Sequence, residues 1–406
     1  MIRATIDSRR CLQELITAGG GGSWPPFATF GDTWPVSLKP YHEVYHGIAN
    51  LIPVSKASVD DCTNRLIIDR FRSSLYTALQ QNLALDAVCV TLDLGDNGME
   101  ASGWMGFFAC IAYLRHAYRW SVSPVVREAQ NETSLLFPEH LDIPWTALRR
   151  RFGLSSSSGN LTSNIYCNFN ERQELEYSFT TGMSHIHRET ERWNAILFME
   201  MERKAIPMYH LMVTAIEAVE SGRAAEALEA LRSAKSHLKD IFKYFFDNLT
   251  DANISQQLWM AYVQGPHGWA LDGIDGVSGG QSLVIRTVDA FLGIRPFPDS
   301  ATEALHLPLP QRIWLNSLRE YNLRAVARAN AGSKVIQTEL DDMAKQLRVW
   351  RMGHMRRMVA YEGVVRPERE KMTAGKSLVA SEIAPDENAM VKHLKDQLAL
   401  RLAQTK

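Results

Sequence analysis

The chain has 406 residues, and its 44 Lys and Arg against 45 Asp and Glu leave a net charge of −1 when the histidines are neutral. This balance, with no long basic block, argues against a nucleic-acid partner. With 46% hydrophobic and 22% charged residues, the chain has the composition of a globular protein of two or three domains. A chain of this length buries a large core without disulfides.

The cysteines and the apolar segments indicate the cellular setting. The five cysteines are scattered, with neither a Cys-x-x-Cys pair nor zinc-ligand spacing, which favours a reducing cytoplasm. No apolar stretch follows the N-terminal arginines, so we expect no signal peptide. The longest apolar run, residues 104–114, is far shorter than the roughly 20 residues of a membrane span. We therefore expect a cytoplasmic protein with no membrane partner.

The first 36 residues have the pattern of an extension. A short helical pattern over residues 11–16 leads into four consecutive glycines, 19–22, and then into Pro25 and Pro26. Glycine runs and paired prolines are typical of linkers.

The next part of the chain has helical spacing. Apolar residues recur every three or four positions from Tyr41 to about Trp120, and residues 102–118 are apolar enough for a buried helix. A further helix is expected to begin near Asp142, with a proline in its first turn, and to end at Gly153.

The second half of the chain is more strongly helical, and no strand-type alternation persists in it. The predicted helices are 206–219, 223–249, 254–263 (broken by Gly265 and Pro266), 281–292, 338–362 and a peripheral one at 387–403. These patterns predict an all-α protein. We expect an N-terminal extension (1–36), a small helical domain (37–165), a large helical domain (166–365) and a C-terminal tail (366–406).

The helix predicted over 338–362 carries a histidine on its apolar face. The residues that share this face, at spacings of three and four, are Leu340, Met343, Leu347, Trp350, His354 and Met358. Two interpretations are open for His354: a core imidazole bonded to a backbone carbonyl, or a single axial ligand to haem iron in an apolar slot. Arg351, one turn earlier, could reach an anionic group at the edge of such a ligand.

A glycine-rich loop precedes the helix predicted at 281–292. A loop of this kind at a helix N-terminus suggests phosphate binding. Residues 276–282, however, lack the Gly-Lys-Ser/Thr ending, and no strand precedes them. Glycines that let the backbone lie close against a flat ligand are an equally natural explanation.

The loop and the histidine helix, in this order and about 75 residues apart, resemble the indoleamine 2,3-dioxygenase family. The family's glycine loop, its Asp-containing helix ending in Leu-Gly-Ile, and its Leu-Arg-x-x-Arg-x-x-His ligand motif resemble residues 277–282, 288–294 and 347–354. Residues 307–312 and the region 143–168 resemble further family elements. The resemblance extends over roughly residues 40–362.

This resemblance implies a function and a set of site residues. It implies a large haem-binding domain holding haem b, and the insertion of dioxygen across the indole C2–C3 bond of tryptophan or an indole derivative, giving a ring-opened keto-formamide. His354 would be the metal ligand, supported on the haem side by Arg351 and Asp289. The pocket would be lined by Ser278, a catalytic candidate, by Gly279, a substrate contact, and by Gly280.

One departure from the family pattern concerns the substrate carboxylate. The family has an arginine after a Phe-Phe-Ser-Val-Leu run, and this chain has Trp259 after Ile-Ser-Gln-Gln-Leu, which makes Trp259 a candidate substrate contact. Without that bidentate cation, Arg286 or an arginine of the N-terminal domain would have to replace it.

A second departure concerns the distal side of the haem. Residues 187–193 resemble the His-x-x-x-Glu-x-Trp segment of the sister family, the tryptophan 2,3-dioxygenases, whose distal histidine contacts the indole nitrogen. In that register His187 is catalytic. In the indoleamine-type register Ile196 takes the distal position and His187 lies before the helix, where both it and His185 would be solvated.

Two other functions stay open at this stage. Trp259 is compatible with a relative of the pyrrolnitrin-biosynthesis haem enzymes, which rearranges or oxidises a modified tryptophan. A protein of a different class, a non-catalytic helical binding protein in which His354 is a core residue, is the other alternative.

Overall fold

The computed structural model describes residues 7–52, 60–121, 132–272, 274, 276–296, 300–330, 333–362 and 387–405. Over these residues the fold is helical, and β-structure is limited to two isolated bridges, Phe169–Leu175 and Leu271–Ile274. The predicted all-α class is confirmed. Within the same ranges we find no helix with the length and apolar character needed to cross a membrane.

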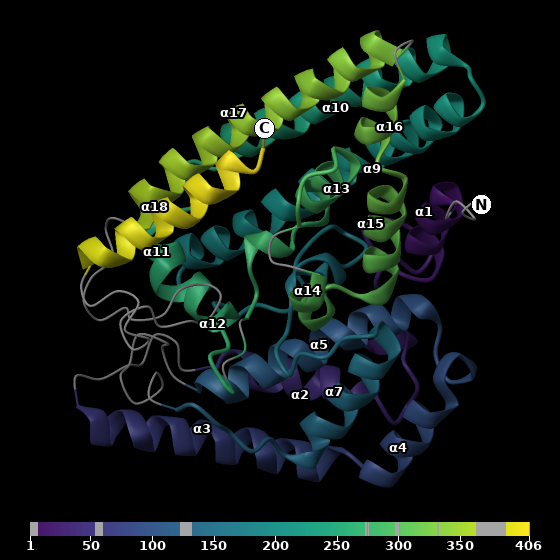
Figure 1. Ribbon diagram of the computed structural model, residues 1–406. Helices are drawn as coiled ribbons and strands as arrows, with labels where there is room; N and C mark the ends of the chain where they lie inside the picture. Colours follow the sequence, from purple (N-terminus) through teal and green to yellow (C-terminus); the bar gives the residue numbers. More distant parts are fainter. Residues whose placement is uncertain are drawn as a thin grey trace.

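The N-terminal half forms a small helical unit around one buried helix (Figure 1). Its helices are α2 (Lys39–Ala49), α3 (Asp61–Asn82), α4 (Leu85–Leu94), α5 (Ala101–Trp120) and α7 (Glu139–Phe152). Nearly every side chain of α5 is buried, as its apolar sequence predicts, and Phe108 stacks on Trp145 of α7. Helix α7 ends where predicted, because Gly153 supplies the left-handed conformation of the C-cap.

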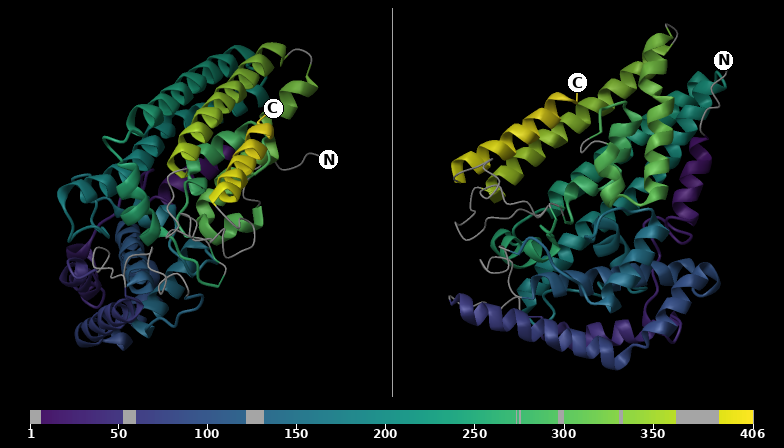
Figure 2. Two further views of the ribbon diagram at one scale, coloured as in Figure 1. Left: turned by 90° about the vertical axis from the view of Figure 1, so that its left-hand side faces the viewer. Right: turned by 60° about the horizontal axis from the view of Figure 1, so that its bottom comes forward.

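Long helices dominate the rest of the chain (Figures 1 and 2). Helices α9 (His185–Glu220), α10 (Ala224–Asn248) and α17 (Lys334–Glu362) pack side by side, and α18 (Glu387–Ala403) lies along α17. The shorter helices are α1 (Ser8–Thr17), α8 (Leu161–Asn164), α13 (Leu283–Phe291), α14 (Ser300–His306), α15 (Leu309–Tyr321) and α16 (Leu323–Ala329). Short 3-10 turns are η1 (Gly31–Thr33), η3 (Gly95–Asn97) and η4 (Tyr166–Asn168).

Two helices differ from the prediction in extent. Helix α9 begins at His185 rather than at residue 206, because the charged residues of its first turns hide the helical pattern and Pro207 is accommodated inside it. The predicted break at Gly265 and Pro266 is absent. Helix α11 (Gln256–Leu258) leads into a π-helix, η5 (Trp259–Gln264), and then α12 (Gly265–His267). Pro266 occupies the first turn of α12, and the helical conformation continues through Gln264 and Gly265 into it.

The N-terminal segment, expected as an extension, is part of the large helical unit. Helix α1 packs on α15 and α9 through Cys11, Leu12 and Leu15, which are buried. After the glycine run, the indole of Trp24 donates a hydrogen bond (3.0 Å) to the carboxylate of Glu202 on α9. The four-glycine run predicts a linker, but α1, the helix before it, is amphipathic and buries its apolar face.

A buried histidine joins the two units. His116 of α5 is completely buried, and its Nδ1 lies 2.8 Å from the carbonyl oxygen of Pro266, while Nε2 accepts a hydrogen bond (3.0 Å) from Gly159 N–H. This pairing requires the neutral tautomer with hydrogen on Nδ1. Burial lowers the pKa of His116 to about 3, despite the opposing effect of the Pro266 carbonyl.

We predict a matching pH dependence of stability. Because the folded pKa of His116 lies below its unfolded value, the unfolded chain binds more protons, and stability is lost as pH falls from about 6.5 towards 3. This group alone should contribute about 1.5 to 2 kcal/mol of loss between pH 6.5 and 5. The free energy of unfolding of His116→Gln, measured by urea titration at several pH values, should depend less steeply on pH. His210→Gln, at an exposed position of α9, should keep the wild-type slope. Equal slopes in all three proteins would contradict the assignment.

Candidate functional site

The imidazole of His354 lies between α17 and α10, against aromatic rings from both helices. Its ring stacks on Trp350, with centroids 5.0 Å apart and planes 13° apart, and lies 5.8 Å from the ring of Phe245. Helix α17 approaches α10 closely here, since a Cβ on Gly353 would lie 2.6 Å from the Phe246 ring. The predicted apolar stripe is therefore present from Leu340 to His354, and the Met358 side chain lies outside the described residues.

The protonation state of the His354 ring is compatible with metal ligation. Burial, and then the nearby Arg351 guanidinium, lower its pKa to about 4, so the ring is neutral near pH 7. Among the described residues neither ring nitrogen makes a hydrogen bond, and the carbonyl contact expected of an ordinary core histidine is not found there. A neutral imidazole with a free nitrogen in an apolar wall fits an axial haem ligand.

A buried ion-pair network stands one turn before His354. One guanidinium nitrogen of Arg351, Nη2, donates to both carboxylate oxygens of Asp289 of α13, at 2.7 and 2.8 Å. Arg401 of α18 pairs with the same carboxylate, and Arg351 also bonds to the Thr405 hydroxyl. The network ties the helix of His354 to α13 and α18. Arg351, expected from sequence to reach an anionic ligand, is engaged with Asp289 and Thr405.

The glycine loop is held by hydrogen bonds within its own backbone and side chains. Ser278 caps the 3-10 turn η6 (Gly279–Gln281), and its Oγ accepts a hydrogen bond (3.2 Å) from Gly280 N–H. The buried Gln281 amide donates to Gly276 O (2.9 Å) and accepts from Leu161 N–H (2.8 Å). Gly279 and Gly280 are exposed, and a Cβ on Gly279 would lie 3.5 Å from the ring of Phe198 on α9. That this loop lines a haem pocket stays a prediction.

The two distal candidates meet at the contact between α9 and the π-helix η5. His187 lies in the first turn of α9, not before the helix, and its Nδ1 is 2.7 Å from the Oγ of the N-cap Ser184. Its ring meets Tyr262 of η5 edge to face, at 4.8 Å. Trp259, at the start of η5, donates a hydrogen bond (2.9 Å) to Asn194 Oδ1 of α9. His187 is half-buried, and burial lowers its pKa, so the solvated-loop interpretation is wrong for this residue.

The π-helix lies where the two helical units meet. Trp259 packs against the core of the large unit and Tyr262 against the core of the small unit. His185, in contrast, is exposed, as its solvated interpretation predicts, and Ile196 is half-buried in the core of the large unit. Single-turn π-helical segments are frequent at functional sites.

Arg286 is not available to replace the missing carboxylate-binding arginine. Its guanidinium is buried, donates to Glu303 Oε1 (2.7 Å) and donates through Nε to the carbonyl oxygen of Gly280 (2.7 Å). Glu303 also pairs with Arg319, so moving Arg286 out of the pair would leave its own buried guanidinium without a carboxylate, which is costly. The proposed replacement by Arg286 is therefore wrong.

Sequence reasoning missed several residues that position these groups. Asn194 and Arg401 carry no motif, and only the packing of distant helices brings them to Trp259 and Asp289. Glu202 could have been identified from the sequence, because it is a carboxylate on the buried, apolar face of α9. It accepts hydrogen bonds from Trp24, Tyr166, Tyr209 and the Val284 amide, and burial raises its pKa.

These features define the class of the protein. The described part of the chain is helical, and within it the imidazole of His354 has no hydrogen-bond partner and lies one turn from the Arg351–Asp289 pair. Residues 100–399 match the indoleamine 2,3-dioxygenase family, and the chain belongs to it. The match begins later than the expected resemblance at residue 40 and extends beyond residue 362 into α18. No curated protein matches the chain.

Membership of this family establishes the general activity. Its members are haem-dependent oxidoreductases acting on tryptophan or related indoles, with dioxygen as co-substrate, and this chain is an enzyme of that type. The non-catalytic binding protein, an open alternative from the sequence, is therefore set aside.

The ion-pair network generates a prediction about stability. Asp289→Asn keeps the side-chain size but leaves the buried Arg351 guanidinium and the half-buried Arg401 guanidinium without their carboxylate, so we expect a loss of about 3 kcal/mol or more in the free energy of unfolding. Asp247→Asn removes the carboxylate of an exposed i,i+4 pair with Lys243 and should cost less than about 0.5 kcal/mol. Urea unfolding followed by circular dichroism compares the two. Equal losses would show that the buried network contributes no more than a surface ion pair.

Proposed function

We propose that this enzyme inserts dioxygen across the C2–C3 bond of tryptophan or an indole derivative to give a ring-opened keto-formamide. We further propose that it uses haem b with His354 as the iron ligand. Family membership carries this proposal, together with the neutral imidazole of His354, which has no hydrogen-bond partner in the part of the chain that the structure describes. All five cysteines are free, which supports the proposed cytoplasmic setting.

The proximal residues hold the ligand in one position and one protonation state. Haem, when bound, supplies the iron that activates dioxygen towards an electron-rich indole. Trp350 restricts the rotation of the His354 ring by stacking on it, and burial keeps the ring neutral. Arg351 and Asp289 hold α17 against α13, so helix packing positions the imidazole.

On the distal side, we assign substrate orientation to His187 and Ser278. The contact of His187 Nδ1 with Ser184 leaves Nε2 as the atom that would accept a hydrogen bond from an indole N–H. The Ser278 hydroxyl accepts from Gly280 N–H and so keeps its own hydrogen to donate to a pocket ligand. Gly279 and Gly280 leave the loop without side chains, which allows a flat ligand to approach its backbone.

The substrate side favours an indole without a free carboxylate. Trp259 stands where the family has its carboxylate-binding arginine and is bonded to Asn194, and Arg286 is engaged with Glu303. This pair of observations supports a second candidate, a pyrrolnitrin-biosynthesis-like reaction in which a modified tryptophan is rearranged or oxidised.

The assignment of His354 predicts a spectroscopic result. The purified chain reconstituted with haem should show a Soret band, and the reduced protein should change its visible spectrum with dioxygen and an indole. His354→Ala should lose the Soret spectrum of the wild type and bind haem at least about tenfold more weakly, because the side chain that would hold the iron is gone. His210→Ala should behave as wild type. A wild-type chain that stays colourless after reconstitution, or an alanine variant with an unchanged spectrum, would contradict the role of His354.

The substrate assignment predicts a preference. Indoles without a carboxylate should be turned over with kcat/KM equal to or above that of tryptophan, with both added oxygen atoms visible by mass spectrometry. Trp259→Arg should raise kcat/KM for tryptophan by about 10- to 100-fold, since a charge-assisted hydrogen bond is worth about 1.5–3 kcal/mol. Trp259→Phe, which also removes the bond to Asn194 but adds no cation, is the matched control. A strong wild-type preference for tryptophan would exclude the carboxylate-free substrate class.

A further inference from the structure

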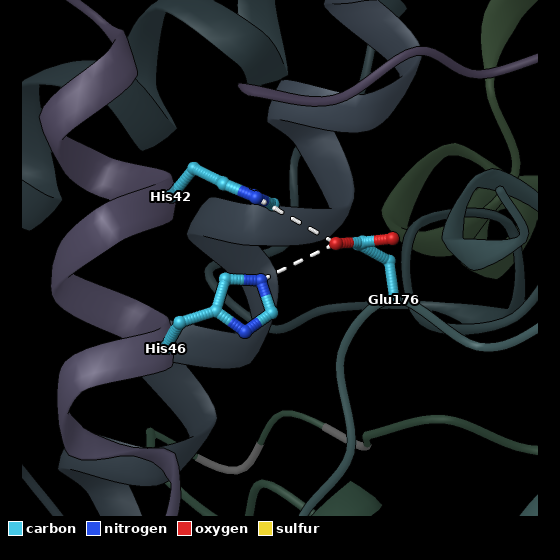
Figure 3. A group of neighbouring side chains, drawn as sticks. All are labelled: His42, His46 and Glu176. Atoms are coloured by element: carbon cyan, nitrogen blue, oxygen red, sulfur yellow. Dashed lines mark ion pairs between the residues drawn. The ribbon is translucent and has the colours of Figure 1, made fainter. Parts of the chain in front are cut away.

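A second group of metal-ligating side chains lies in the small helical unit, on elements separate from α17. His42 and His46 are one helical turn apart on the same face of α2, and Glu176 reaches them from the segment before α9 (Figure 3). Glu176 Oε1 lies 3.6 Å from His42 Nε2 and 3.3 Å from His46 Nε2. The three ligand atoms all lie within 4.8 Å of one another.

The His42 ring is held with Nε2 towards Glu176. Its Nδ1 is 2.9 Å from the Tyr177 hydroxyl, and its ring meets Trp34 edge to face at 5.8 Å. A Cβ on Gly31 would lie 2.7 Å from the His42 ring, so only glycine leaves room for this orientation, in a backbone with φ of +44°. Histidines that bind a metal through one ring nitrogen typically hydrogen-bond through the other, as His42 does here through Nδ1.

The carboxylate of Glu176 faces both imidazoles. Burial, and then the neighbouring His46, lower the pKa of His42 below its ordinary value. Burial raises the pKa of Glu176, but contacts with His46, His42 and Asn170 outweigh it and lower the pKa below its ordinary value. Asn170 donates a hydrogen bond (3.3 Å) to Oε2, which leaves Oε1 facing both imidazoles.

We propose that His42 Nε2, His46 Nε2 and Glu176 Oε1 bind a zinc ion, with water at the remaining position. Two imidazoles and a carboxylate are a known ligand set for zinc in proteins. Zinc bonds of about 2.0–2.1 Å in a tetrahedron place neighbouring ligand atoms about 3.3–3.4 Å apart, close to the two separations found here. These separations are long for N–H···O hydrogen bonds. The His46 side chain is 45% exposed, which gives the ion and its water access.

The bound ion would join α2 to the segment that leads into α9. Residues 169–176 contain one of the isolated bridges, Phe169–Leu175, and are followed by Tyr177, whose buried ring packs against Tyr45 of α2. Zinc would therefore connect the first helix of the small unit to the chain that enters the large unit. This link is separate from the ligation of haem iron.

The test uses the haem-loaded full chain, freed of zinc by chelator dialysis. Equilibrium dialysis against zinc chloride, with zinc and iron measured by mass spectrometry, should give one zinc per chain at saturation. His46→Ala, at an exposed position that leaves the core intact, should weaken zinc binding by at least about 10-fold, and Glu176→Gln similarly. Tyr177→Phe, which keeps all three ligands but removes the contact to His42 Nδ1, should weaken it less. His210→Ala should bind as wild type, and magnesium should not compete.

The comparison is independent of the proposed catalytic function, because zinc content is read without turnover and iron content reports haem loading in the same sample. Zinc X-ray absorption of the wild type should show two imidazole nitrogens and carboxylate oxygen. Substoichiometric zinc in the wild type, or equal affinity in His46→Ala and the wild type, would overturn the site. The three side chains would then be a histidine–carboxylate ion pair only.

Discussion

The ion-pair network of Asp289 is the contact on which the rest of the candidate haem site depends. One carboxylate accepts two guanidinium groups, from Arg351 of α17 and Arg401 of α18, and it does so in the buried interior. Low polarity makes such a pairing strongly directional, since any arrangement that separates the charges leaves one of them unpaired. Helices α13, α17 and α18 therefore have one relative position, and the imidazole of His354 is oriented by it.

The same physical effect, desolvation of an imidazole, serves two purposes in this fold. At His116 it maintains a neutral ring that donates to one chain segment and accepts from another, which joins the two helical units. At His354 it maintains a neutral ring with no protein partner among the described residues, which leaves a nitrogen free for a ligand. His116 has hydrogen-bond partners on two chain segments, whereas His354, half-buried, has none among the described residues.

For the candidate substrate-binding residues, the sequence identifies the residue and only the packing shows its partner. Trp259 is visible in the sequence as a departure from the family, but its partner Asn194 is not, because the bond spans two elements. Arg286 was a reasonable replacement for the missing cation by its position near the glycine loop. In the structure Arg286 is paired with Glu303. Glu303 lies on α14, a helix that the sequence did not predict, so this pairing was not expected. An arginine's availability depends on its partners, which a sequence does not show.

By itself, the sequence determined the helical class, the helix ends at strong caps such as Gly153, and the apolar stripe that carries His354, because these depend on residues close together in the chain. It also carried the family, through motifs of adjacent residues. Only the tertiary structure decided which charges pair, that His187 lies within α9, and that His42 and Glu176 converge. Those contacts join segments distant in sequence, and their energy depends on burial, which exists only once the helices have packed.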